Sequence, residues 1–224
     1  MVARQSAGSE LTAIAEKRFL VTDLDNTLID SRERFNRSIS EAIGYTSSSA
    51  TSSVLVAKKL PPEQRNRFYE VFLSGKYMDL DIPVKGSVEV ISRVRSMGLG
   101  IVYLTGRHHS KEDSLKTETL ESLSRLGFPM PNMRDVLLCM KPRKMMPTAR
   151  YKRNILERLA RSLKLAVGVD DEPDDLQVMA DFIPITIGLA LSPHISREIT
   201  SKIRVPIAKD WFEVESIILK NSLF

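Results

Sequence analysis

The chain has 224 residues, 42% hydrophobic and 27% charged, a balance that excludes disorder as its main state and suits one globular domain or a domain with a small insert. A single cysteine, Cys139, excludes an internal disulfide framework, and the net charge of +5 fits an anionic ligand without by itself indicating nucleic acid. No apolar run approaches the roughly 18 residues of a membrane span, and the polar N-terminal extension, residues 1–17, has no apolar secretory core. We therefore expect a cytoplasmic protein without a membrane partner.

Short apolar runs alternate with amphipathic segments over most of the chain. The apolar runs predict strands at 18–22, 100–104, 135–140 and 165–169, and two peripheral strands at 183–189 and 203–207. The amphipathic segments predict helices at 86–97, 114–126, 151–163 and 211–219. Because strands that alternate with helices form parallel sheets, this pattern predicts an α/β fold. Its Rossmann-like core would comprise residues 18–30 and 82–224, with helices on both faces of a parallel sheet.

Residues 31–81 interrupt this alternation. Helices are predicted here at 32–43, 53–60 and 63–73, without a convincing strand between them. The segment therefore predicts a small all-helical cap inserted after the first strand. Seven of its basic side chains could face a ligand site, although solvated helix faces are the commoner arrangement; they are Arg32, Arg34, Arg37, Lys58, Lys59, Arg65 and Arg67.

Polar residues follow the first predicted strand, in the segment Asp23-Leu24-Asp25-Asn26-Thr27. In parallel sheets, ligands bind outside the carboxyl ends of the strands. Two carboxylates two residues apart can serve as nucleophile and proton donor, or as a metal pair, and both uses need a cation or a shared proton between them. A solvated turn with an Asx cap is the alternative interpretation.

An acidic cluster follows the strand predicted at 165–169. It places five carboxylates in six residues, Asp170-Asp171-Glu172-Pro173-Asp174-Asp175. Oxygen ligands of this kind select hard cations such as Mg²⁺. Acidic residues at a helix N-terminus would explain Glu172 or Asp174 alone, because the helix dipole favours them, but not the two aspartates that adjoin the strand.

Two further segments favour an anionic ligand. Thr105-Gly106-Arg107 follows the strand predicted at 100–104, and a hydroxyl with free backbone N–H groups there would form a small anion-binding nest. The segment 141–153 holds many basic residues and no acid. Most of it is expected to be a solvated loop, but one of its lysines could bind a phosphate as a point charge.

Taken together and in this order, these four groups resemble the motifs of the haloacid dehalogenase-like hydrolase superfamily. Its first motif, Asp-x-Asp-x-Thr after a strand, matches residues 23–27 in full. Its second, a Ser or Thr at a later strand end, matches Thr105, and its third, a lysine near the start of the helix before the last motif, is best matched by Lys152. The resemblance spans residues 18–190.

The fourth motif of that superfamily is an acidic pair spaced Asp-x-x-x-Asp. Asp171 and Asp175 match it, with Asp170 where many members have glycine. Asp170 with Asp174 is an alternative register. The first register is preferred because Pro173 and an aliphatic residue then fall where similar members place them.

The resemblance implies the role of each site residue. Asp23 would attack phosphorus and form an aspartyl-phosphate, and Asp25 would protonate the leaving oxygen and then activate water. The implied phosphate-binding residues are Thr105, Gly106 and Lys152, with Arg107 as a further substrate contact. The implied ligands of Mg²⁺ are Asp23, the backbone carbonyl of Asp25, Asp171, and Asp170 or Asp175.

The second aspartate of the first motif also implies the branch. Members that cleave carbon–halogen bonds usually lack it, so Asp25 favours a phosphatase, or alternatively a phosphomutase. A small phosphorylated molecule is the expected substrate, and no particular oligomeric state is predicted. Polynucleotide 3′-phosphatase domains also resemble the chain in their Thr-Gly-Arg turn, basic segment and adjacent aspartates, so a nucleic-acid substrate is a less favoured alternative. A non-catalytic phosphate- or nucleic-acid-binding module is the least favoured.

Overall fold

The computed structural model describes residues 17–44, 59–109, 115–132, 134–144 and 146–221. Residues 1–16 of the predicted N-terminal extension lie outside this part of the chain, as does most of the helix predicted at 53–60. Within the described residues, no helix has the length and apolar character needed to cross a membrane.

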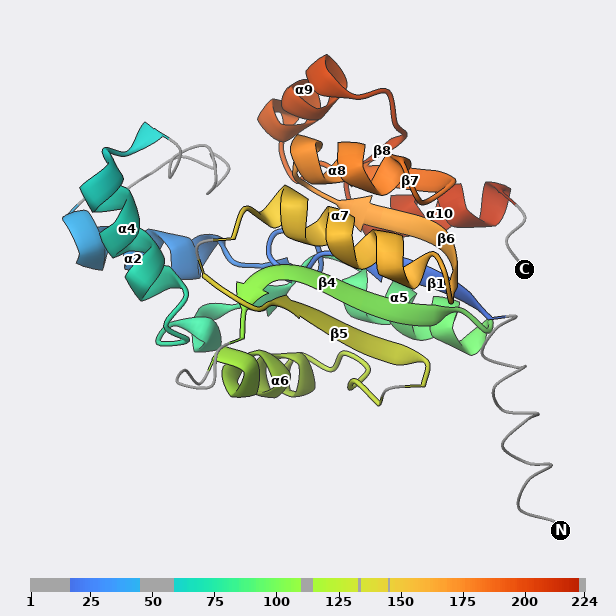
Figure 1. Ribbon diagram of the computed structural model, residues 1–224, viewed down its shortest axis with the longest axis horizontal. Helices are drawn as coiled ribbons and strands as arrows, with labels where there is room; N and C mark the ends of the chain where they lie inside the picture. Colours follow the sequence, from blue (N-terminus) through green and yellow to red (C-terminus); the bar gives the residue numbers. More distant parts are fainter. Residues whose placement is uncertain (1–16, 45–58, 110–114, 133, 145, 222–224) are drawn as a thin grey trace, which may run out of the picture.

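A six-stranded sheet forms the centre of the molecule (Figure 1). Its strands, in spatial order, are β5 (Val136–Lys141), β4 (Gly100–His108), β1 (Arg18–Thr22), β6 (Lys164–Asp170), β7 (Ile185–Leu189) and β8 (Ile207–Ala208). Every neighbouring pair is parallel, so all six carboxyl ends meet at one edge. β1 lies between β4 and β6, which brings the segments that follow these three strands together.

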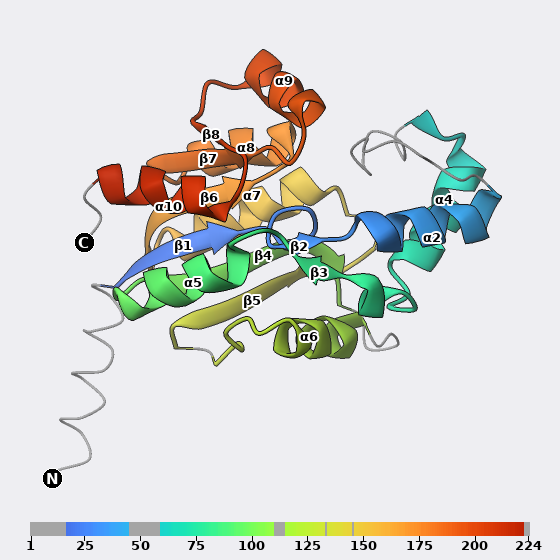
Figure 2. The same cartoon turned by 180° about the vertical axis from the view of Figure 1, so that it is seen from behind.

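Helices cover both faces of the sheet, as Figures 1 and 2 show from opposite sides. One face carries α5 (Ser87–Ser96), α6 (Leu115–Arg125) and α10 (Trp211–Lys220), and the other carries α7 (Thr148–Leu159) and α8 (Pro173–Ala180), with α9 (Pro193–Lys202) beside α8. Side chains of β1 alternate between the two cores, Leu20 toward α5 and α10, Phe19 and Val21 toward α7 and α8. The predicted α/β class is confirmed.

Two helices, α2 (Arg32–Ile43) and α4 (Pro62–Phe72), form a pair beyond the carboxyl edge of the sheet (Figure 1). Their apolar faces meet around Phe35, Phe68 and Phe72, and the ring centroids of Phe35 and Phe68 lie 4.9 Å apart. The pair joins the core through the antiparallel strands β2 (Ile29–Asp30) and β3 (Ile82–Pro83), with the short 3₁₀ helix η1 (Met78–Leu80) before β3. We call α2 and α4 the helical pair.

Two predictions for the sheet require correction. β4 does not end at Leu104: it continues through Thr105, Gly106 and Arg107 to His108, with an irregular register against β5 over this last part, so the Thr-Gly-Arg segment lies inside the strand. The strand predicted at 203–207 is reduced to β8, because the preceding residues follow the unpredicted helix α9. Ser192, whose hydroxyl accepts a hydrogen bond from the Ile195 amide, and the adjoining proline are the start signals that could have revealed α9.

Candidate active site

The segment after β1 folds into a tight turn at the centre of the carboxyl edge. The Leu24 carbonyl accepts hydrogen bonds from the amides of Leu28 and Ile29, at 2.9 and 2.8 Å. Asn26 has φ = 59°, a left-handed conformation that asparagine tolerates better than most residues. Thr27, at the end of the turn, donates from its hydroxyl to Asp171 Oδ1 at 3.1 Å. The turn is thereby held against the residue that follows β6.

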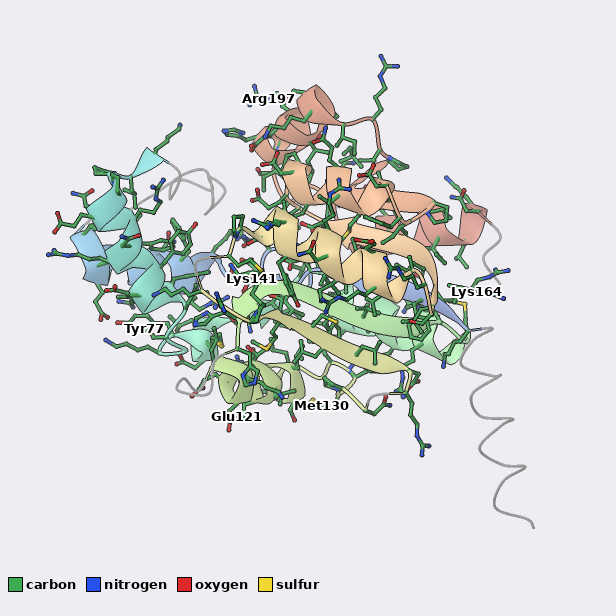
Figure 3. The ribbon with its side chains drawn as sticks, in the orientation of Figure 1. Tyr77, Glu121, Met130, Lys141, Lys164 and Arg197 are labelled. Carbon is green, nitrogen blue, oxygen red and sulfur yellow. The ribbon has the colours of Figure 1, made fainter. Side chains whose placement is uncertain are left out.

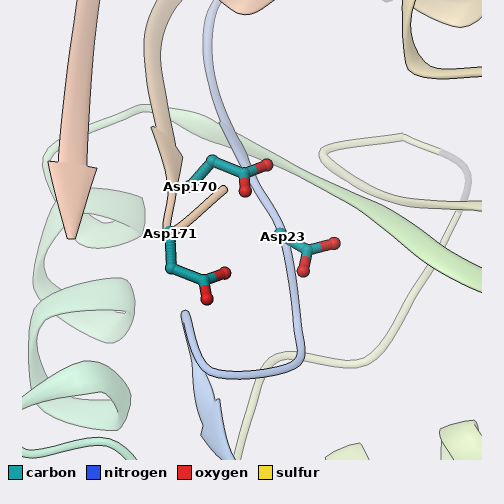
Figure 4. A group of neighbouring side chains, drawn as sticks. All are labelled: Asp23, Asp170 and Asp171. Carbon is teal, nitrogen blue, oxygen red and sulfur yellow. The ribbon is translucent and has the colours of Figure 1, made fainter. Parts of the chain in front are cut away.

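Three buried carboxylates converge at this edge (Figure 4). Asp23 follows β1, Asp170 ends β6 and Asp171 follows it, and one oxygen of each lies within 4.8 Å of the others. Burial raises the pKa of Asp23 to about 8 and, together with Glu172 and Asp170, raises that of Asp171 well above its ordinary value. The site therefore concentrates more negative charge than its protein surroundings balance. Because all three donors are carboxylate oxygens, these residues fit a hard divalent cation such as Mg²⁺.

Lys152, near the start of α7, is the cation within this acidic group. Its Nζ lies 2.6 Å from Asp170, 2.7 Å from Asp175 and 3.2 Å from Asp23. Burial opposes the charge of Lys152, but these carboxylates raise its pKa well above the ordinary value. One ammonium group therefore faces four aspartates when Asp171 is included. A further cation would bring the charge of the site closer to balance.

The carboxylate of Asp25 does not join this cluster. Arg107 donates to it twice, through Nε at 2.9 Å and Nη2 at 2.8 Å, and Arg34 Nη2 contacts it from α2. Arg34 Nε also lies 2.9 Å from Asp81, which is 3.4 Å from Arg107. We call Asp25, Arg34, Asp81 and Arg107 the Asp25 network. It joins the helical pair, the segment before β3 and β4 around a single carboxylate.

The network fixes the charge of Asp25. Burial alone would raise the pKa of this carboxyl, but Arg107 and Arg34 hold it well below its usual range. Asp25 is therefore ionised at neutral pH and has no proton to give in this arrangement. Arg34 was one of seven basic residues of the insert that the sequence could not rank, and Asp81 carried no motif, so the network was not predicted.

The remaining predicted residues occupy distinct places. Thr105 is fully buried and accepts a hydrogen bond from the Arg107 amide, whereas Gly106 reaches the cavity surface. Asp175 is buried against Lys152. Asp174 is exposed, lies 3.1 Å from Lys202 and also borders the cavity.

A cavity of about 730 Å³ lies between the helical pair and the carboxyl edge. Asp23, Lys152 and Asp171 form part of its floor, and Tyr69 and Arg65 of α4 line it from the opposite side. The end of β5, the start of α7 and the segment between them supply another wall: Lys141, Lys144, Met146, Pro147, Thr148 and Ala149. A molecule in this cavity would meet the acidic cluster and α4 at once.

No family model matches the sequence, and no curated protein matches it. Solved structures do resemble the fold. A haloacid dehalogenase-like hydrolase from Streptococcus pneumoniae superposes with a TM-score of 0.64 at 15% identity, covering 92% of this chain and 99% of that one. A predicted phosphatase from Clostridium acetobutylicum gives 0.65 at 14% identity, covering 91% and 99%.

A third structure, from Thermotoga maritima and predicted to be a beta-phosphoglucomutase, gives a TM-score of 0.57 at 16% identity and covers 92% of this chain and all of the other. These likenesses show that the chain has the haloacid dehalogenase-like fold. The superfamily resemblance of the sequence is confirmed at that level.

Proposed function

We propose that the protein is a phosphatase that hydrolyses a small phosphomonoester through an aspartyl-phosphate on Asp23. One observation carries the proposal: Asp23 directly follows the central strand, on the cavity floor, beside Lys152 and the carboxylates of Asp170 and Asp171. A nucleophilic carboxylate needs nearby positive charge to receive an anionic substrate. The likeness of the fold to hydrolases and phosphatases supports the same conclusion.

The chemistry divides into two transfers. An oxygen of Asp23 attacks phosphorus, the alcohol leaves, and water then hydrolyses the acyl phosphate and restores the carboxylate. Lys152 binds a phosphoryl oxygen and balances the charge that develops there, and the Gly106 backbone borders the same space. Asp23, Asp171 and the backbone carbonyl of Asp25 would hold Mg²⁺, with Asp170 in support. The cation would neutralise charge on the phosphoryl group.

Asp25 is the residue proposed as general acid and base, and its surroundings set a condition on that role. A proton donor needs a pKa near the working pH, but Arg34 and Arg107 keep Asp25 ionised. Asp25 must therefore lose contact with at least one arginine before it protonates a leaving group. Aryl esters, whose leaving groups depart without protonation, should depend on Asp25 less than alkyl esters do.

We also propose that the helical pair is a cap that selects the substrate. α4 lines the cavity opposite Asp23, so whatever group the phosphate is attached to lies against α4. Residues 31–81 would then be the cap, with residues 18–30 and 82–224 as the core.

Hydrolysis of an aryl phosphate with and without Mg²⁺ tests the proposed function. Asp23→Asn should abolish turnover, whereas Asp181→Asn should retain it, because Asp181 is an exposed carboxylate that pairs with the exposed Arg153. Both variants should melt near the wild-type temperature. Full activity of Asp23→Asn would refute the aspartyl-phosphate mechanism.

A phosphomutase is the second candidate, favoured by the likeness to the Thermotoga maritima structure. It would use Asp23 in the same way but return the phosphoryl group to a substrate hydroxyl. Transfer to a sugar monophosphate faster than transfer to water would distinguish it from a phosphatase.

A further inference from the structure

Lys141, the last residue of β5, is a buried cation that forms no close ion pair with any residue that the structure describes. Its exposed fraction is 7%, and its Nζ contacts only the carbonyls of Lys144 and Met146, at 3.4 and 3.2 Å, and Thr148 Oγ1, at 3.4 Å. Within the described part of the chain, no carboxylate oxygen lies within 4.0 Å of it, whereas the other buried basic side chains, Arg34, Arg107 and Lys152, all have such partners. Burying a charge without a close counter-ion is unfavourable, so an anion bound beside this ammonium group would be stabilised.

The position of Lys141 indicates where that anion comes from. Figure 3 labels Lys141 at the end of β5, beside the space that separates the helical pair from the sheet, and it lines the cavity. Thr148 Oγ1, which it contacts, lies 3.3 Å from the place that a Cβ on Gly106 would occupy. The Thr148 hydroxyl therefore links the ammonium group to Gly106, the residue of β4 whose backbone is proposed to border the phosphate.

Lys141 is separate from the lysine that serves the nucleophile. Lys152 already occupies the space beside Asp23, Asp170 and Asp175, whereas the Lys141 ammonium contacts the carbonyls of Lys144 and Met146 in the segment before α7. The cavity wall from Lys141 to Ala149 contributes two cations, Lys141 and Lys144, and no acid. This wall has the charge that a second anion would require. Burial lowers the pKa of Lys141, and the more distant carboxylates of Asp175 and Asp23 offset this effect only in part.

We propose that Lys141 binds a second anionic group of the substrate, so that the natural substrate is a phosphomonoester that carries a carboxylate or another phosphate a few bonds from the transferred phosphoryl group. This inference rests on the proposed phosphatase function. Because a charge-assisted hydrogen bond in a desolvated site is stronger than a neutral one, removal of the lysine charge should weaken such substrates selectively.

The test compares three alkyl substrates that differ in the second group: ethyl phosphate, phosphoglycolate and ethylene glycol bisphosphate. Lys141→Met removes the charge at similar length. Lys141→Gln removes the charge but can still donate to the carbonyls, which keeps the test available if Lys141→Met does not fold. Lys164→Met is the matched control, because Lys164 is exposed at the opposite end of the sheet.

The wild type and Lys164→Met should prefer phosphoglycolate or the bisphosphate to ethyl phosphate. The Lys141 variants should lose about 10- to 100-fold in kcat/KM for the preferred substrate, mainly through KM, and change ethyl phosphate by less than about twofold. An equal loss on all three substrates would overturn the proposal, because Lys141 would then act on the transferred phosphoryl group or on the fold. No change on any substrate would overturn it as well.

A binding measurement separates failure of this inference from failure of the proposed function. Calorimetric titration of the same three compounds needs no turnover. In one outcome, an aryl phosphate is not hydrolysed, but the wild type binds phosphoglycolate or the bisphosphate at least tenfold more tightly than the Lys141 variants do. The proposed anion site is then confirmed, and the proposed phosphatase activity is wrong. If turnover occurs but affinities do not change, only the Lys141 inference fails.

Discussion

Substitution of Arg34 by methionine should destabilise the protein strongly, because Arg34 belongs to a buried and electrically balanced network. Two arginines and two aspartates form the network, so loss of Arg34 leaves Asp25 and Asp81 with Arg107 alone. Breaking a buried ion pair from one side costs about 3–5 kcal/mol. For a chain of this size, that corresponds to a fall in Tm of roughly 6–20 °C.

The loss should depend on pH through Asp81. Burial raises the pKa of this carboxyl to about 6, against an ordinary value of 3.8, even with both arginines beside it. A group whose pKa is raised by folding stabilises the protein below its unfolded pKa, and this contribution is lost as the pH rises through the folded pKa. Without Arg34 the pKa of Asp81 rises further, so Arg34→Met should lose less stability at pH 5 than at pH 8.

Urea unfolding at pH 5 and pH 8 measures both effects. The double variant Arg34→Met/Asp81→Leu provides the control, since it restores charge balance and leaves the pair of Asp25 and Arg107. It should lose at least about 1 kcal/mol less than the sum of the two single variants, as expected for residues in one network. Additive losses, or a loss below about 1 kcal/mol for Arg34→Met alone, would refute the coupling.

Two further predictions concern the metal site and the turn after β1. Since the pKa of Asp23 is raised to about 8, the metal-free protein should lose stability as the pH rises through 8. Mg²⁺ should therefore raise Tm more at pH 8.5 than at pH 6. Equal shifts in Tm at the two pH values would count against the metal site. Trp211 is fully buried, and its Nε1 donates to the Thr27 carbonyl at 2.8 Å. Trp211→Phe should therefore cost about 2–4 kcal/mol in thermal or urea unfolding, whereas Phe212→Leu, at an exposed neighbour, should cost less than about 1 kcal/mol.

The sequence was sufficient to predict the sheet and the acidic cluster, and the reason is topological. In a parallel sheet with β1 at its centre, the residues that follow β1 and β6 must meet at one edge. Asp23 follows β1 and Asp171 follows β6. The topology alone therefore predicts that these two carboxylates lie close together, without knowledge of side-chain packing. Lys152 follows from the same logic, because α7 leads directly into β6.

The Asp25 network could not be predicted because it depends on packing between segments without a repeating pattern. Arg34 and Asp81 are 47 residues apart, and their pairing is decided by how the helical pair closes on β2 and β3. On a helical projection, the Arg34 side chain resembles the exposed basic residues around it. β4 was misread for a related reason: Thr-Gly-Arg resembles a turn, but pairing of His108 with Lys141 of β5 continues the strand through it.

The same network links the position of the helical pair to the proposed acid–base residue. Two connections join the helical pair to the core: one enters α2, where Arg34 lies in the first turn, and the other leaves through Asp81 before β3. Arg34 forms ion pairs with Asp25 and Asp81, and Asp81 also lies beside Arg107. Both connections are therefore held to Asp25 or to its partner Arg107. Opening of the cavity by movement of the pair must shift Arg34, and loss of that positive charge raises the pKa of Asp25. A carboxylate that both arginines keep ionised would therefore gain a proton more readily if the pair moved and took Arg34 with it. A substrate that separates Arg34 from Asp25 would have the same effect, which makes proton donation conditional on an occupied cavity.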